Sequence, residues 1–85
     1  MDDKTFAMIK ELTELQGTSG NERNIRNYMR ERMAPLVDRI ETDGLGGIFG
    51  IREHEDETAP RIMVAAHMDE VGFMVSGITE RGLFR

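Results

Sequence analysis

Residues 64–73 of this 85-residue chain read Val64-Ala65-Ala66-His67-Met68-Asp69-Glu70-Val71-Gly72-Phe73. In this stretch an apolar run is followed by a histidine and two carboxylates. The apolar run extends back to residue 61, and its length and continuity predict a central strand of an α/β sheet, buried on both faces. Because a strand places residues i and i+2 on one face, His67 and Asp69 are expected to point the same way. In open α/β sheets, ligands gather beyond the carboxyl ends of the strands, where His67 would emerge.

Two interpretations of this histidine follow from the residues alone. His67 could hold a metal through one ring nitrogen while Asp69 accepts a hydrogen bond from the other nitrogen and fixes the tautomer. By spacing alone the more usual case is a core histidine satisfied by a neighbouring hydrogen bond, because short His/acid patterns often occur by chance. One imidazole does not complete a metal site, so both interpretations remain open at this point.

Two amphipathic helices are expected ahead of the apolar run. Helical spacing of apolar residues predicts a first helix over residues 3–16, with Gly17 as its stop. Ser19 followed three residues later by Glu22 predicts a capping box at the start of a second helix. The apolar face of that helix comprises Ile25, Tyr28, Met29, Met33 and Leu36, and the residue before Pro35 is expected to end it.

A β-hairpin is expected after the second helix. Alternating polarity predicts a half-exposed strand over residues 37–42, and a glycine-rich turn over 43–47 leads into a second strand at 48–51. The glycines do not have the spacing of a nucleotide-binding loop, so no nucleotide cofactor is expected. Residues 53–60 combine charge with a proline and predict a solvated loop, which carries the chain's other histidine, His54.

Composition narrows the possible functions. Hydrophobic residues make up 39% of the chain and charged residues 32%, as in a small soluble globular unit. A net charge of −5 argues against a nucleic-acid partner, since phosphate binding needs a concentrated positive surface. No apolar run is long enough to cross a membrane and no secretory signal is visible, so a cytoplasmic location is expected. Without cysteine, any metal would have oxygen and nitrogen ligands.

Three motifs in order resemble the M42 metallo-aminopeptidases, the family of glutamyl and deblocking aminopeptidases. The first is Gly17-Thr18-Ser19-Gly20-Asn21-Glu22 between the expected helices, and the second is Thr42-Asp43-Gly44-Leu45-Gly46-Gly47 in the expected hairpin. The third is the run from Arg61 to Val75, centred on His67 and Asp69. The chain departs from the family at Gly47, where asparagine is often found, and it is far shorter than the family's two-domain enzymes.

The resemblance implies a fold and a domain division. Residues 1–70 would be the N-terminal part of a zinc-aminopeptidase-like α/β catalytic domain. Residues 71–85 would begin an inserted all-β domain that mediates subunit association, with a strand over 71–78 and a polar turn over 79–82. Family enzymes form dodecamers built from dimers, so the resemblance implies a homo-oligomer for a complete enzyme.

The resemblance also implies a chemistry. Two divalent metals, zinc or cobalt, would acidify a water molecule and polarise the scissile carbonyl of a peptide substrate. His67 would ligate one metal, Asp69 would orient His67, and Glu70 would have a structural role. The family's catalytic glutamate belongs to a Glu-Glu pair that is absent from these 85 residues.

The expected function is therefore that of an N-terminal fragment of a two-metal aminopeptidase that removes N-terminal residues, including Glu or Asp, from peptides. The fragment itself is expected to be inactive. The alternative is a non-catalytic α/β module derived from that family, which associates with itself through exposed strand edges.

Overall fold

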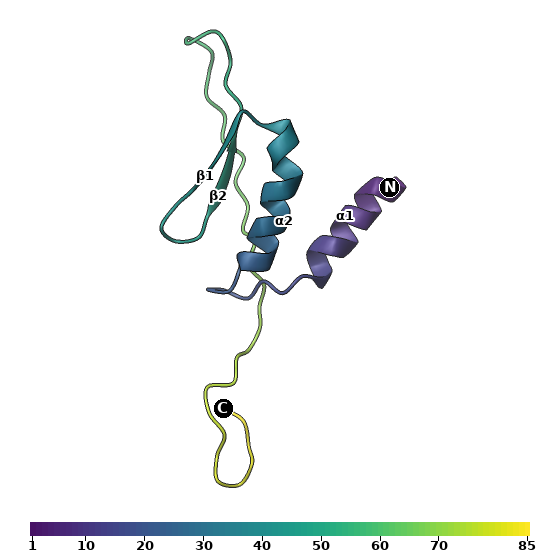
Figure 1. Cartoon of the computed structure of the whole chain (residues 1–85), viewed down its shortest axis with the longest axis vertical. Coiled ribbons are helices and arrows are strands. Elements are labelled where there is room, and N and C mark those ends of the chain that lie inside the picture. The colour runs from purple at the N-terminus through teal and green to yellow at the C-terminus, as the bar shows by residue number, and fades with distance from the viewer.

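Two helices and one hairpin form the regular structure of this protein, whose residues 1–85 are all described by a computed structural model. The elements in chain order are α1 (Asp3–Glu14), α2 (Arg23–Met33), the 3₁₀ turn η1 (Ala34–Leu36), β1 (Arg39–Thr42) and β2 (Ile48–Ile51). Helix α2 lies along the hairpin, α1 projects to one side, and the remaining chain forms a long arm that ends at the C-terminus (Figure 1). The predicted helices and hairpin are confirmed, with different boundaries.

Helix α1 is capped by a side chain at its start. Asp2 precedes the first turn, and its Oδ1 accepts a hydrogen bond from the Thr5 amide at 2.7 Å. This bond satisfies one of the amides that the first turn leaves without a helical partner. The helix ends at Glu14 because Leu15 is already extended, so the prediction that Gly17 stops a helix reaching residue 16 is wrong.

The cap makes α1 sensitive to acid. Its hydrogen bond from the Thr5 backbone lowers the pKa of Asp2 from the ordinary value of 3.8. Because the pKa of Asp2 is lower in the folded chain than in the unfolded chain, the cap contributes its full stabilisation at pH values above 3.8. This contribution is lost as the pH falls through the lower, folded-state pKa. We expect the Thr5 amide resonance to follow this transition in an acid titration, and the transition to be absent from Asp2→Ala. An unchanged Thr5 titration in that variant would contradict the cap.

Helix α2 starts without the predicted capping box. Its first helical residue is Arg23, no side chain caps its amides, and Glu22 Oε1 instead accepts from the Gly20 amide at 2.8 Å. Gly20 has a φ of +85°, which a residue with a side chain rarely adopts, so the chain turns sharply before the helix. The helix ends at Met33, and residues 34–36 with Pro35 continue as the 3₁₀ turn rather than as α-helix.

One polar contact joins the two helices. The Tyr28 hydroxyl of α2 donates a hydrogen bond to Glu11 Oε2 of α1 at 2.6 Å. Donation to this carboxylate raises the pKa of Tyr28, because deprotonation would break the bond and place two negative charges together. Within the predicted apolar face, Ile25, Tyr28, Met29 and Met33 are half-buried, whereas Leu36 lies beyond α2 and is exposed.

The hairpin is antiparallel and is closed by an aspartate turn. Its register pairs Arg39 with Ile51 and Thr42 with Ile48, so the first strand begins two residues later than predicted. Asp43 Oδ1 accepts from the Leu45 amide at 2.9 Å and from the Gly47 amide at 2.7 Å. These side-chain bonds add to two backbone bonds of the turn, from the Asp43 amide to the Gly47 carbonyl oxygen and from the Gly46 amide to the Asp43 carbonyl oxygen.

Glycine lets the hairpin approach α2 closely. A Cβ at Gly50 would lie 3.0 Å from both Met33 Sδ and Val37 Cγ1, closer than side-chain carbons normally pack. At the other end of the hairpin, Arg26 Nη1 of α2 donates to the Gly46 carbonyl oxygen at 3.1 Å. These contacts fix the hairpin along one side of the helix.

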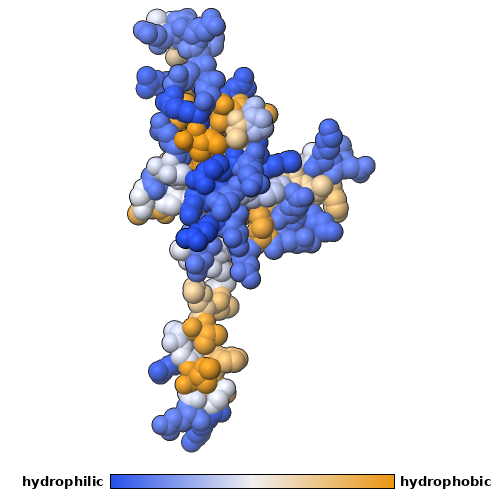
Figure 2. Space-filling model, viewed as in Figure 1, coloured by the Kyte–Doolittle hydropathy of each residue, from blue (hydrophilic) through white to orange (hydrophobic).

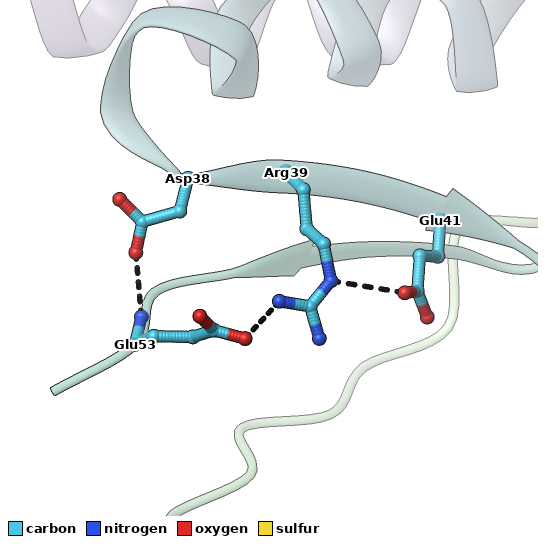
Figure 3. Close-up of polar contacts among 4 residues, drawn as sticks. All are labelled: Asp38, Arg39, Glu41 and Glu53. Atoms are coloured by element: carbon cyan, nitrogen blue, oxygen red, sulfur yellow. Dashed lines mark hydrogen bonds and ion pairs between the residues drawn. The ribbon is translucent and has the colours of Figure 1, made fainter.

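A charged cluster closes the open end of the hairpin. Arg39 of β1 forms an ion pair with Glu41 at 3.0 Å and a second, closer one with Glu53, while the Glu53 amide donates to Asp38 Oδ2 at 2.6 Å (Figure 3). Hydrogen bonds to Glu53 and then to Glu41 raise the pKa of Arg39. All these side chains are exposed, so the ion pairs contribute little to the free energy of folding. Their main effect is to hold the segment at Glu53 against β1.

The predicted buried strand at residues 61–66 is wrong for this chain. These residues form no strand, and Ile62, Met63 and Val64 are 85%, 81% and 93% exposed. A central strand needs neighbours that pair with its backbone and cover its faces, and the two-stranded hairpin offers no such place. The strand predicted at 71–78 is also absent; near the C-terminus only an Ile78–Phe84 bridge forms.

Apolar side chains therefore gather along the arm instead of in a core. Figure 2 shows them concentrated on the lower part of the arm and in one patch beside the hairpin. Gly17 is the single buried residue of the chain. No helix combines the length and the apolar character that crossing a bilayer requires.

Candidate functional site

His67 and Asp69 form a direct pair in the extended arm. The Nδ1 atom of His67 lies 3.1 Å from Asp69 Oδ1 and 3.0 Å from the Asp69 carbonyl oxygen. The His67 side chain is 85% exposed, whereas that of Asp69 is 43% exposed. The two side chains thus lie together, with the histidine reaching into solvent.

The two Asp69 oxygens determine which ring nitrogen of His67 carries the proton. An ionised carboxylate and a carbonyl oxygen can only accept hydrogen bonds, so Nδ1 must carry the proton that it shares with them. In the neutral ring, the lone pair then resides on Nε2, which has no partner within the chain. A metal-ligating histidine has this arrangement, in which a carboxylate holds one ring nitrogen and the other faces the metal.

The chain supplies one such imidazole rather than a complete set of metal ligands. Nowhere does it gather three or more His, Asp or Glu side chains in a geometry that could hold a metal ion. His54 does not join the His67–Asp69 pair. Its Nδ1 accepts a hydrogen bond from the Asp56 amide inside the acidic loop. The His67–Asp69 pair therefore offers one imidazole nitrogen without a partner, which is fewer donors than a metal centre needs.

A cleft opens beside the His67–Asp69 pair. His67 and Asp69 line one side of it, and Thr18 and Ser19, from the loop between α1 and α2, line the other. The cleft is thus formed by two segments about fifty residues apart in sequence. Residues with hydroxyl, carboxylate and imidazole side chains thus line one cleft, together with Val71, Gly72 and Met74.

Two hydrogen bonds hold these segments together. The Glu70 amide donates to the Gly17 carbonyl oxygen at 2.8 Å, and Glu70 Oε1 accepts from the Gly17 amide at 3.3 Å. The segments run parallel, with a backbone bridge between Thr18 and Glu70. The Glu70 side chain thus contacts the loop at Gly17, and the expectation that it has a structural role or supports the site stays a prediction.

The loop that faces the pair is not predicted from the sequence as part of the site. Gly17 is predicted there as a helix stop and Ser19 as a cap, whereas in the structure Gly17 lies in the contact and Ser19 borders the cleft. The available signal was the Gly17-Thr18-Ser19-Gly20 motif itself, which has more small residues than one helix boundary needs. Nothing in the sequence indicates that its partner is Glu70.

The chain is similar to known peptidases along nearly its whole length. The family model described as M42 glutamyl aminopeptidase matches residues 46–85, and a second model, AMPT, matches residues 3–29. A glutamyl aminopeptidase of Lactococcus lactis subsp. cremoris is 58% identical over 80 residues, which are 94% of this chain and 22% of the relative. A lysyl aminopeptidase of Pyrococcus furiosus is 35% identical over 81 residues, again 94% of this chain and 22% of the relative.

The chain thus spans about a fifth of the length of these curated relatives. The M42 model covers the arm with His67, Asp69 and Glu70, and the AMPT match includes the loop that contacts it. The chain belongs to the M42 peptidase family and corresponds to the N-terminal portion of such a protein.

Proposed function

We propose that these residues are the N-terminal part of a two-metal aminopeptidase in which His67 is a metal ligand and Asp69 orients it. The carrying observation is the Nδ1–H of His67 held by Asp69, which leaves Nε2 free to ligate. Bound zinc or cobalt would supply Lewis acidity toward a substrate carbonyl and a water molecule. The residues of this chain would contribute one imidazole, the carboxylate that fixes its tautomer, and the wall at Thr18 and Ser19.

We propose peptides with acidic N-terminal residues as substrates of the complete enzyme. The support is the name of the Lactococcus lactis relative, a glutamyl aminopeptidase. The Pyrococcus furiosus relative, with lower identity, is a lysyl aminopeptidase. Comparing glutamyl and lysyl chromogenic substrates in the complete enzyme tests this assignment, and a preference for the lysyl substrate would reverse it.

The domain division and the cell compartment are part of the same proposal. Residues 1–70 would belong to the catalytic domain and residues 71–85 to a β-rich association domain, with a cytoplasmic homo-oligomer as the assembled form. The exposed apolar residues of the arm support this division, because further strands of an enzyme would cover them.

One observation favours the alternative of a self-associating module without catalytic activity. The apolar residues Ile62, Met63 and Val64 are largely exposed in an extended segment that has no strand partner. Such a segment can pair with another copy of itself. Sedimentation of the 85-residue chain separates the two functions, because the module alternative requires a defined oligomer and the aminopeptidase proposal does not.

A chimera provides the direct activity test. The 80 residues that match the Lactococcus lactis glutamyl aminopeptidase would replace the corresponding residues of that enzyme. We expect the folded chimera to hydrolyse an aminoacyl chromogenic substrate, because this chain supplies the same ligand and orienting carboxylate. A chimera with native secondary structure and oligomeric state but no activity would contradict the proposal.

Metal binding by the chain alone is expected to be weak. A catalytic zinc normally takes about three protein ligands, and this chain offers His67 with its orienting Asp69. Isothermal titration with zinc should therefore give a shallow curve that His67→Ala abolishes. Tight one-to-one binding by a monomer would mean that the chain holds a complete site, contrary to the proposal.

A further inference from the structure

The contact between the arm and the loop of α1 and α2 lies directly beside the candidate metal ligand. Glu70 follows Asp69 in sequence and forms two hydrogen bonds with Gly17, one through its backbone amide and one through its side chain. Gly17 is the one buried residue in the chain, so this contact is its most enclosed point. An amide in such a place needs an acceptor, because water does not replace a lost partner there.

The surroundings of this contact leave little room for the two segments to shift. A Cβ at Gly72 would lie 2.2 Å from Thr18 Cγ2, so either the Thr18 side chain or one of the segments would have to move. Gly17 itself faces Ile25 of α2, since a Cβ there would lie 3.3 Å from Ile25 Cγ2. Further along, Asn21 Nδ2 contacts Met74 Sδ at 3.2 Å. The two segments therefore touch at both ends of residues 70–74.

We propose that Glu70 is a positioning residue for the candidate metal site. Its carboxylate anchors the segment that carries His67 and Asp69 to the loop at Gly17, so that Thr18 and Ser19 form the facing wall of the cleft. This inference rests on the proposed function, because the site it positions is the one that His67 would form. Glu70 itself neither touches the metal-facing nitrogen nor points toward it.

Amide hydrogen exchange on the full 85-residue chain, without metal, tests the anchor. Glu70→Ala removes the acceptor of the Gly17 amide, and we expect that amide to exchange about tenfold faster, the effect of one hydrogen bond. Glu70→Gln keeps an oxygen at the same position and should restore slow exchange. The matched control Glu80→Ala, at an exposed glutamate in the C-terminal turn, should leave Gly17 unchanged.

A zinc titration followed by NMR tests positioning as distinct from stability. In the parent chain, zinc binding at the His67 ring should also shift the Thr18 and Ser19 amides across the cleft. In Glu70→Ala the ring should still respond, while the Thr18 and Ser19 shifts should largely vanish and the amides of α2 stay in place. Glu70→Gln should recover both responses.

The outcomes separate this inference from the proposed function. Equal Gly17 exchange in the parent and Glu70→Ala chains would overturn the anchor, as would Thr18 and Ser19 shifts that do not depend on Glu70. A His67 ring that zinc leaves unmoved in the parent chain would instead overturn the ligand assignment. Gly72→Ala is a second probe, since its added methyl group should push the segments apart and accelerate Gly17 exchange even with Glu70 intact.

Discussion

Replacing His67 with alanine is expected to abolish hydrolysis by the chimera described above. The variant removes the Nε2 atom that we assign to the metal and leaves Asp69 without the ring that it holds. Removing one ligand from a site of about three lowers the affinity for the metal and misplaces the ion that remains. The loss should therefore appear in both the metal content and the rate with an aminoacyl chromogenic substrate.

The chain's other histidine provides the matched control. His54 lies in the acidic loop, where its ring accepts a hydrogen bond from the Asp56 amide, and it has no contact with the cleft. His54→Ala should therefore retain full activity and full metal content. A His67→Ala chimera with parental activity would exclude His67 as a ligand.

Replacing Asp69 with alanine should have the second-largest effect. Without the carboxylate, the Nδ1–H of His67 keeps only the backbone carbonyl oxygen of residue 69 as an acceptor, so the ring and its tautomer are held less firmly. Loss of such an orienting partner typically lowers metal affinity or activity by about ten- to a hundredfold. Chelator competition measures the affinity, and chromogenic assays measure the rate.

Asp69→Asn distinguishes orientation from charge. The amide oxygen of asparagine can still accept from Nδ1–H, so this variant should retain more affinity than Asp69→Ala. If the two variants lose equal affinity, the negative charge of Asp69 is what matters. An affinity that neither variant changes would mean that Asp69 does not orient the histidine.

Local signals in the sequence predicted the helices and the hairpin well. Apolar spacing in α2 and the glycine turn after Asp43 depend on residues close in sequence, so their structures follow from local rules. The apolar run at 61–66 is different, because a strand exists only when another strand pairs with it. The continuous apolar run predicted the strand, but this chain contains no neighbouring strand that pairs with it.

The same distinction between local and long-range contacts applies to the candidate site. The pairing of His67 with Asp69 was predictable because they are two residues apart and the chain is extended there. The contact between Glu70 and Gly17 joins residues 53 positions apart, and no periodicity indicates such a contact. The His67–Asp69 pair could therefore be predicted from the sequence, but the loop that faces it could not.

The central claim is that His67 presents Nε2 to a metal while Asp69 holds Nδ1. Nitrogen-resolved NMR of the histidine rings, recorded as zinc is added to the 85-residue chain, measures this directly. The account predicts that zinc shifts the Nε2 resonance of His67, that Nδ1 remains protonated, and that the His54 ring is unchanged. Zinc binding at Nδ1 of His67, or at His54 alone, would contradict the account.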